Sequence, residues 1–330
     1  MKIFLTGGTG FIGKHMVRKL AQTDHQVRCL VRNVQRARHI QEAGMEIFIG
    51  DVTDYASVLA GMQGCDVVIN LANLYSMWSL HREEFSKVNV EGTRNVMSAA
   101  LETGVKKVVY VSTVAVYGKP DESPIREDTP HGKRWFSDYG RTKAEGDRLS
   151  WELHRTRGLP LVTLYPGIVL GAGDDKASGI YIQTLLHRNT PTTIFNHSKA
   201  TYMYAGDVAE AALRTLEKQD NIGQKYMLGK EVLNGLQYGQ MISEISGVPL
   251  PLFRFPDFIV MCAAYLLTAL SALTRRMPPW GLSVDAAWTL LKGFVIDGSK
   301  AERELGIHYT PVRVALEEAI ESYGVRKHGD

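Results

Sequence analysis

The chain has 330 residues, with 38 lysines and arginines against 35 aspartates and glutamates. This length can bury a large core and suits one α/β domain with an elaborated second lobe. The positive and negative charges nearly balance, so the chain lacks the excess of basic residues that is typical of nucleic-acid-binding proteins. We therefore expect a small-molecule substrate and no nucleic acid.

Three cysteines, Cys29, Cys65 and Cys262, lie in apolar segments. Their spacing matches neither a metal site nor a redox pair, so we expect three buried, reduced thiols and no bound metal. The chain opens directly on an apolar strand pattern and shows no cleavable signal. A reducing cytoplasm is the expected location.

The first predicted element is an apolar strand at 2–6, followed by a glycine-rich loop and a helical pattern. Gly7 permits a tight turn out of the strand, Gly10 leaves no side chain between backbone and ligand, and Gly13 lets the helix pack closely on the sheet. The amides at the helix start, aided by the helix dipole, can bind a pyrophosphate. A glycine cluster alone can be an ordinary turn, but its place directly after the first strand predicts dinucleotide binding.

The first half of the chain alternates apolar strands with helical stretches. We expect short strands, buried on both faces, at 2–6, 26–31, 45–50, 65–70, 107–112 and 160–165. The longest helices are expected at about 82–103 and 138–157. This alternation predicts a parallel sheet. Right-handed crossovers would make it a doubly wound Rossmann fold, with ligands at the carboxyl ends of the strands.

The regular alternation of strands and helices ends after Pro166, where a glycine-rich loop from Gly167 to Gly179 leads into a mixed region with fewer clear strands. A helix at 207–217 and a strand at 224–228 are expected to return to the main sheet. We therefore predict an α/β protein with a Rossmann dinucleotide-binding domain and a smaller, mixed C-terminal substrate lobe. The domain covers 1–166 together with 205–230, and the lobe covers 167–204 and 231–330.

The segment 258–274 contains no charged residue, and Arg275 and Arg276 follow it. It falls just short of the length of a bilayer span, so we do not expect a transmembrane helix. We favour a helix buried in the substrate lobe. The alternative is a surface or substrate-entry helix whose arginines meet lipid headgroups, with peripheral membrane contact through 258–276. The oligomeric state stays open, and a homodimer is compatible with the sequence.

Tyr139 and Lys143 form a Tyr-x-x-x-Lys pair at the start of an expected helix. Positions four apart share one helix face, so the ammonium would lie beside the phenol. A tyrosine with a pKa near ~10 becomes a useful acid or base at neutral pH only if a nearby cation stabilises its phenolate. Only this pair follows the fifth strand at a suitable distance. The same spacing recurs at Tyr226/Lys230 and Tyr323/Lys327.

The fifth expected strand ends in two hydroxyl residues, Ser112 and Thr113. Hydroxyls at the carboxyl end of a central strand lie where a nicotinamide would sit. Ordinary strand-end capping explains such a pair equally well on its own. Combined with the glycine loop and Tyr139, the pair favours a catalytic role.

Together these motifs resemble the extended branch of the short-chain dehydrogenase/reductase superfamily, which holds the NAD-dependent epimerases and dehydratases. The matching pieces cover nearly the whole length: Thr6 to Gly13, Asp51-Val52, Asn70 to Asn73, Asn89 to Thr93, Ser112-Thr113, Tyr139 with Lys143, and Tyr165 to Gly167. The resemblance implies that Tyr139 donates or accepts a proton and that Thr113 orients the substrate oxygen. It implies that Lys143 holds the cofactor ribose and lowers the pKa of Tyr139. Asn89, by itself an ordinary helix residue, would take a structural and solvent-relay role.

The resemblance extends to the cofactor. It implies adenine contacts from Asp51, which alone would be a helix cap, and from Val52, and it implies a cofactor channel lined by Leu71 and Ala72. The full expected set of cofactor-binding residues is Gly7, Thr9, Gly10, Phe11, Ile12, Gly13, Arg32, Asp51, Val52, Leu71, Ala72, Asn73, Ser112, Tyr139, Lys143, Tyr165, Pro166 and Ile168.

The end of the second strand distinguishes NADP from NAD. An acidic residue there would bind the ribose 2′-hydroxyl of NAD, but this chain has Arg32 and Asn33, with Arg36 one turn on. Arg32 could pair with a 2′-phosphate. A solvated basic loop is the alternative. We expect NADP, with NAD as the second choice.

The substrate class depends on the second lobe. Nucleotide-sugar enzymes of this superfamily commonly place arginines before the helix that begins here at Asp207 and before a final Gly-Asp element, but this chain has none at 200–206 or 288–297. A diphosphate would lack its bidentate partners. The pattern at 299–306 instead resembles dihydroflavonol reductases, 3β-hydroxysteroid dehydrogenases and hopanoid-associated homologues.

We therefore expect an alcohol/ketone oxidoreductase acting on an apolar or ring-bearing substrate, such as a steroid, terpenoid or flavonoid. A nucleotide-sugar epimerase or dehydratase with tightly bound NAD stays open as the alternative. A non-catalytic NADP-binding sensor is a further class, but it would need no proton donor. The intact set of Thr113, Tyr139 and Lys143 argues against it.

Overall fold

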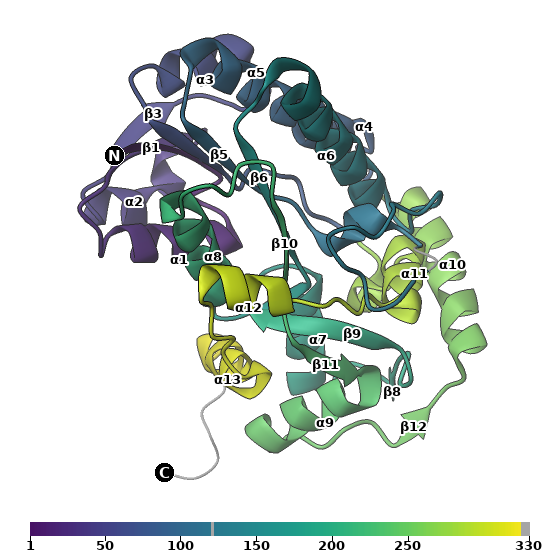
Figure 1. Ribbon diagram of the computed structural model, residues 1–330. Coiled ribbons are helices and arrows are strands. Elements are labelled where there is room, and N and C mark those ends of the chain that lie inside the picture. The colour runs from purple at the N-terminus through teal and green to yellow at the C-terminus, as the bar shows by residue number, and fades with distance from the viewer. Residues whose placement is uncertain (120–121, 325–330) are drawn as a thin grey trace.

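The structure, a computed structural model, describes residues 1–119 and 122–324. Its centre is a seven-stranded sheet with the strand order β10-β6-β5-β4-β1-β2-β3 (Figure 1). All neighbouring strands pair in parallel, so the predicted doubly wound α/β fold is confirmed. The strands are β1 (Lys2–Thr6), β2 (Gln26–Val31), β3 (Glu46–Ile49), β4 (Val67–Asn70), β5 (Lys107–Val111), β6 (Leu161–Pro166) and β10 (Lys225–Leu228).

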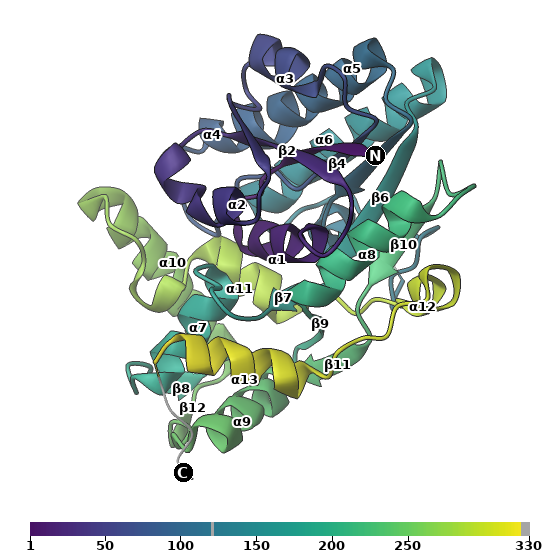
Figure 2. The same ribbon diagram turned by 90° about the vertical axis from the view of Figure 1, so that its left-hand side faces the viewer.

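Helices cover both faces of this sheet (Figures 1 and 2). One face packs on α1 (Phe11–Leu20), α2 (Arg38–Glu42), α8 (Ala205–Glu217) and α12 (Ser299–Leu305). The other packs on α3 (Tyr55–Met62), α5 (Thr93–Thr103) and α6 (Asp138–Arg157). This double cover explains the apolar strands. At the edge, β3 is only half-buried and Ile49 is exposed, so the expected burial on both faces is wrong for that strand.

The second half of the chain returns to the sheet where the sequence predicted it. Strand β10 pairs with β6 from Lys225↔Thr163 to Leu228↔Pro166. The end of α8 is held by Lys107 of β5, whose buried ammonium donates to the carbonyl oxygens of Thr215 and Leu216 at 3.2 and 3.1 Å. The sheet is therefore completed by residues far along the chain.

The smaller lobe has two short sheets. One has the order β11-β9-β7 and the other pairs β12 with β8. The segment 167–179, expected to be a loop, contains β7, because its apolar residues pair in parallel with β9. The elements of the lobe are β7 (Ile168–Leu170), α7 (Ala177–Leu186), β8 (Thr192–Thr193), β9 (Lys199–Tyr204), β11 (Glu231–Asn234), α9 (Gly235–Ser246), β12 (Phe253–Arg254), α10 (Asp257–Thr274), η4 (Pro279–Gly281), α11 (Val284–Lys292) and α13 (Val312–Ser322).

The helix α10 lies at the outer edge of the molecule in both views (Figures 1 and 2). Only Val260, Ala264 and Ser271 of this helix are buried, so the favoured prediction of a helix buried in the lobe is wrong. Cys262 is exposed for the same reason, whereas Cys29 and Cys65 are buried as expected. Among the described residues, α10 is the one helix long and apolar enough to cross a membrane, by length and composition only.

Candidate active site

The glycine loop follows β1 and packs on the end of β4. Gly7 has a φ of 74°, and a Cβ there would lie 2.7 Å from the amide nitrogen of Ala72. A Cβ on Gly13 would lie 2.1 Å from the Gly7 carbonyl oxygen, so α1 can start this close only at a glycine. The Thr6 hydroxyl supports the turn, because it donates to Asn70 Oδ1 at 2.6 Å and accepts from the Ala72 amide at 3.2 Å.

Gly10 forms the open side of this loop. Within 4 Å, a Cβ on Gly10 would meet only the Gly7 carbonyl oxygen, at 3.2 Å, as far as the chain is described. Helix α1 begins after Gly10 with no side-chain cap and no acidic residue in its first turn, so its first amides are available to an anion. Thr9, Phe11 and Ile12 flank the opening and are partly exposed. The loop thus fits a dinucleotide pyrophosphate at the place predicted from the sequence.

Arg32 and Asp51 meet at the same edge of the sheet. The register pairs Thr6 with Leu30, so Arg32 follows β2 beside the glycine loop. Its side chain is 70% exposed, and one guanidinium nitrogen lies 3.7 Å from Asp51 Oδ2. Asp51 also accepts hydrogen bonds from the amide and the hydroxyl of Thr53 at 2.9 and 3.0 Å. A pair this exposed holds Arg32 weakly and leaves it able to bind another anion.

The other expected cofactor contacts lie at or just beyond the carboxyl ends of the strands, the edge where ligands bind in such sheets. Ala72, Asn73 and Ile168 are accessible, whereas Val52, Leu71, Ser112, Tyr165 and Pro166 are buried. The fold therefore brings these residues to one edge of the sheet, although five of the eight are buried.

Helix α6 carries the Tyr-x-x-x-Lys pair. Ser137 begins it, because its hydroxyl accepts the Gly140 amide at 3.1 Å, and Gly158 ends it with a φ of 70°. These caps explain why the helix has the predicted bounds. Tyr139 lies in the first turn and Lys143 one turn on; their exposed fractions are 7% and 1%. The pair is therefore almost fully shielded from water.

Thr113, which the resemblance also places in the site, lies near enough to the Tyr139 hydroxyl to lower its pKa. Burial raises the pKa of Tyr139, while the positive charge of Lys143 and the Thr113 hydroxyl lower it. The effect of burial is the largest, so the pKa lies above its ordinary value. Lys143 lowers the pKa of Tyr139, as the resemblance implies, but burial raises that pKa by more.

The Lys143 ammonium lies between Tyr139 and β5. It donates to the Tyr110 hydroxyl at 3.0 Å and to the Val111 carbonyl oxygen at 3.3 Å. Desolvation lowers its pKa, while the charges of Tyr139 and Asp147 act against this. An ammonium has three donors, so Lys143 keeps capacity for a further oxygen such as a ribose hydroxyl. Sequence analysis missed Tyr110, because a tyrosine inside an apolar strand resembles core.

Asn89 lies in a π-helical turn (Lys87–Gly92) between α4 (Glu83–Ser86) and α5. Its amide donates to the Leu74 carbonyl oxygen at 3.0 Å and to Thr142 Oγ1 at 3.1 Å, and its oxygen accepts the Leu74 amide at 2.7 Å. Asn89 therefore ties the loop after β4 to the first turns of α6. This geometry supports a positioning role, and a solvent-relay role stays a prediction.

Asp147 lies on α6, one turn after Lys143. Burial raises its pKa to about 6, and the Tyr165 hydroxyl donates to its two oxygens at 3.0 and 3.1 Å. The Tyr165 side chain thus points into the core, and a cofactor could meet only its backbone. Sequence analysis missed Asp147, although a carboxylate four residues after Lys143 on the same helix face was the available signal.

The C-terminal lobe reaches the start of α6. Asp285 of α11 accepts the Asp138 amide at 3.3 Å, and Arg82 pairs with both of these carboxylates. The rings of Tyr75 and Tyr139 meet edge-on with 4.7 Å between centres. Tyr139 belongs to an apolar cluster that we call the apolar wall, whose other members used here are Leu74, Tyr75, Met77, Phe136 and Phe294.

The other two Tyr-x-x-x-Lys pairs lie outside this site. Tyr226 is on β10, and Lys230 lies beyond the end of that strand. An extended backbone separates positions four apart by about 13 Å, and the Tyr226 hydroxyl donates to Glu304 at 3.0 Å. The hydroxyl of Tyr323 donates to the Asp174 carbonyl oxygen, and Lys327 is outside the described residues. The structure therefore supports the choice of Tyr139.

Comparison with known proteins agrees with this arrangement. The sequence profile described as the NAD dependent epimerase/dehydratase family matches residues 3–229, which include the glycine loop, Tyr139 and Lys143. The chain belongs to this family. Members of the family are NAD-dependent oxidoreductases, epimerases and dehydratases, so the predicted extended short-chain dehydrogenase/reductase relationship is confirmed.

Relatives of the family span nearly the whole chain. A candidate dihydroflavonol 4-reductase of Synechocystis sp. is 28% identical over 99% of this chain and 95% of its own length. A ketoreductase of Stigmatella aurantiaca, named for a 4-farnesyl-3-oxo-dihydroquinoline-1-oxide, is 28% identical over 93% of this chain and 91% of its own. 3β-Hydroxysteroid dehydrogenases are also among the relatives, which confirms the predicted branch.

The fold is shared with a solved epimerase. The structure of UDP-glucuronic acid 4-epimerase from Bacillus cereus, in complex with UDP-glucuronic acid and NAD, matches with a TM-score of 0.78. The match covers 99% of this chain and 100% of that one, at 23% identity. This likeness concerns the fold.

Proposed function

We propose that this protein is an NAD(P)-dependent oxidoreductase that interconverts an alcohol and a ketone on an apolar or ring-bearing substrate. The observation that carries the proposal is the apolar wall around Tyr139, the proposed proton donor on α6, whose pKa the Thr113 hydroxyl lowers. The neighbouring cation, Arg82, is paired with Asp138 and Asp285, whose carboxylates offset its charge. The farnesyl-bearing substrate named for the Stigmatella relative fits the same chemistry.

The residues of the chain divide the work. A bound nicotinamide would exchange a hydride with the substrate carbon. In the reducing direction, the Tyr139 hydroxyl gives its proton to the carbonyl oxygen, and Thr113 and Lys143 stabilise the resulting phenolate. Burial destabilises the negative charge of the phenolate, and the positive charge of Lys143 and the hydroxyl of Thr113 partly offset this effect. The apolar wall excludes water from the reacting atoms.

The substrate class is testable by a screen. Steroid, terpenoid and flavonoid-type alcohols are expected to drive cofactor reduction better than UDP- or dTDP-sugars. Apolar burial would provide most of the binding free energy, about 25 cal/mol per Å² removed from water. The measurement is the initial rate of NADPH or NADH formation, with thermal-shift titration of each compound as a second readout.

The contrary result is micromolar binding of a UDP- or dTDP-sugar. The fold shared with the UDP-glucuronic acid epimerase makes this the second candidate. In that case, arginines elsewhere in the lobe would contact the phosphates. Tightly held NAD that co-purifies with the protein would point the same way.

The cofactor proposal concerns Arg32. Arg32→Asp is expected to lose NADP affinity and gain NAD affinity, because repulsion of a 2′-phosphate replaces attraction and a carboxylate can accept the 2′-hydroxyl. Affinities are measured by titrating both cofactors. Arg38→Asp is the matched control, since Arg38 is exposed and pairs with Glu42 on α2. If the ratio of the NADP and NAD affinities is unchanged in Arg32→Asp, Arg32 does not contact a 2′-phosphate and is only a surface charge.

A further inference from the structure

Large apolar side chains are exposed together in one part of the substrate lobe. More than half of those exposed in the described residues lie between 252 and 280, although this segment is a small part of the chain. They are Leu252, Phe253, Phe255, Phe258, Ile259, Tyr265, Leu266, Leu270, Leu273, Met277 and Trp280. We call this set the 252–280 surface. Leu252 is 94% exposed and Leu273 is 81% exposed. Exposure of so many large apolar side chains within one segment is typical of an interaction site.

The helix within this surface is apolar on its outer side as well as on its inner side. A helix on a water-soluble protein normally turns its apolar stripe inward and its polar residues outward. In α10 the hydroxyl of Thr268 faces the protein, where it accepts the Val284 amide at 2.9 Å, and Ser271 is buried. Leu266, Leu270 and Leu273 face outward instead. This pattern suits a helix whose outer medium is hydrocarbon rather than water.

The inner side of α10 is held by the protein, so lipid cannot surround the helix. Val260 and Ala264 pack in a cluster with Phe195, Leu282 and Ala287. A helix fixed in this way can lie in the plane of a membrane interface but does not cross the bilayer while the lobe is folded.

The charges at both ends fit an anionic lipid surface. Arg254 precedes α10 and Arg275 and Arg276 follow it, whereas Asp257 is the one acidic residue between 250 and 283. Tyr265 and Trp280 are exposed among the aliphatic side chains, and both residue types favour the headgroup region. The combination of an apolar face with flanking arginines matches a bilayer better than a neutral protein partner.

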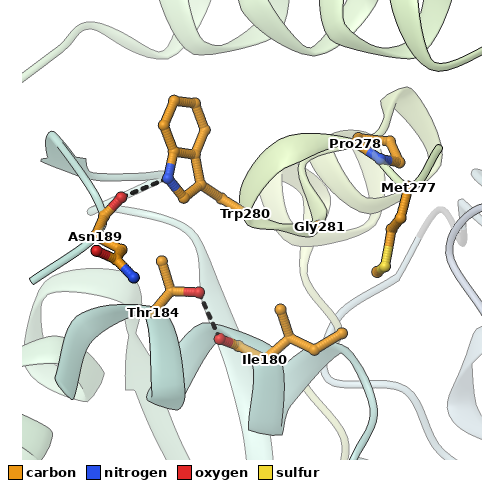
Figure 3. Close-up of a pocket in the computed structure, with 7 residues that line it drawn as sticks. All are labelled: Ile180, Thr184, Asn189, Met277, Pro278, Trp280 and Gly281. Atoms are coloured by element: carbon orange, nitrogen blue, oxygen red, sulfur yellow. Dashed lines mark hydrogen bonds between the residues drawn. The ribbon is translucent and has the colours of Figure 1, made fainter. Parts of the chain in front are cut away.

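The 252–280 surface is connected to the catalytic helix. Ser283, which caps α11, donates to the Met77 carbonyl oxygen in the apolar wall, and Asp285 holds the start of α6. Met277 and Trp280 also line a pocket of about 540 Å³ between α7 and η4, together with Ile180, Thr184, Asn189, Pro278 and Gly281 (Figure 3). An apolar compound leaving the membrane would therefore meet the lobe that flanks Tyr139.

We propose that the 252–280 surface docks on an anionic lipid bilayer, with α10 lying in the interfacial plane, and presents the substrate lobe to a lipid-dissolved substrate. The docking proposal depends only on the 252–280 surface and not on the proposed function. Delivery of the substrate rests on the proposed function.

The test is co-sedimentation of the full chain with vesicles of phosphatidylcholine alone and with vesicles that also contain phosphatidylserine, without substrate. The wild type is expected to bind the mixed vesicles more tightly, and high salt is expected to weaken this binding. Leu266→Asp/Leu273→Asp is expected to weaken vesicle binding about 100-fold or more, because two leucine side chains that would enter the lipid are lost. Arg275→Gln/Arg276→Gln is expected to abolish the preference for phosphatidylserine.

The matched control is Ile222→Asp/Val314→Asp, which makes the same change at two exposed apolar positions away from α10. This control is expected to bind like the wild type. Absence of wild-type binding to either vesicle, or equal binding by the two double variants, would overturn docking. A dimer in light scattering that Leu266→Asp/Leu273→Asp dissociates, without vesicle binding, would assign the surface to a second copy and also overturn it.

Delivery is tested separately with a substrate from the screen, dissolved in the vesicles. Leu266→Asp/Leu273→Asp should raise KM without lowering kcat. Vesicle binding that persists while no apolar substrate turns over would contradict the proposed function and leave docking intact.

Discussion

Replacing Tyr139 with phenylalanine is expected to lower turnover by about 10²–10⁴-fold and to leave dinucleotide binding nearly intact. The phenol hydroxyl is the proton donor in the proposed reaction, whereas the glycine loop and Lys143 hold the cofactor. The change removes one oxygen from a buried ring that keeps its contact with Tyr75. Steady-state kinetics and a cofactor titration on the same preparation measure the two effects.

The matched control for this prediction is Tyr226→Phe. It removes a hydroxyl from another buried Tyr-x-x-x-Lys tyrosine, one that donates to Glu304 on α12. We expect this variant to keep its rate, apart from any loss of stability. A Tyr139→Phe enzyme that retains more than about a tenth of the wild-type rate would contradict the assignment, since acid–base groups contribute far more than this.

The second large effect is expected from Gly13→Ala, which should destabilise the protein by about 3 kcal/mol and abolish dinucleotide binding. The new Cβ would lie 2.1 Å from the Gly7 carbonyl oxygen and 2.7 Å from the Gly8 carbonyl carbon. Both atoms belong to backbone, so no side chain can move aside, and the loop itself must shift. Denaturant unfolding measures the stability, and cofactor titration measures the binding.

Gly10→Ala separates the two consequences. Its backbone lies in the extended region, and its Cβ would meet only the Gly7 carbonyl oxygen, at 3.2 Å, in the described part of the chain. We expect stability close to that of the wild type but weak cofactor binding, because the methyl group occupies the open side of the loop. Equal stability losses in the two variants, or full binding in both, would show that the loop does not hold a dinucleotide in this way.

The sequence predicted the sheet well because strands buried on both faces are continuously apolar. Strands β1 and β2 have the predicted bounds, and α6 runs over 138–157 as expected because Ser137 and Gly158 cap it. The short strand β7 was missed, since its identity depends on pairing with β9, and such a partner is not visible in a local pattern.

The candidate site was predictable as far as its motifs go. The glycine loop, Thr113, Tyr139 and Lys143 converge as expected, whereas Asp147 needed the fold to place it beside Tyr165. The exposure of α10 could not be read from composition. An apolar helix can face a core or face outward, and only the position of α11 and the direction of Thr268 distinguish the two.

The pairing of β10 with β6 also bears on how the protein is made. As synthesis proceeds, β6 is complete at Pro166, but its neighbour begins only at Lys225. At about 5–20 residues per second, the growing chain spends seconds with β6 as an open edge. During this interval its backbone groups can pair with another nascent chain, and the Lys107 ammonium lacks the carbonyl oxygens of α8. Closure of the cofactor-binding half therefore awaits the synthesis of residues 167–228, which include part of the substrate lobe.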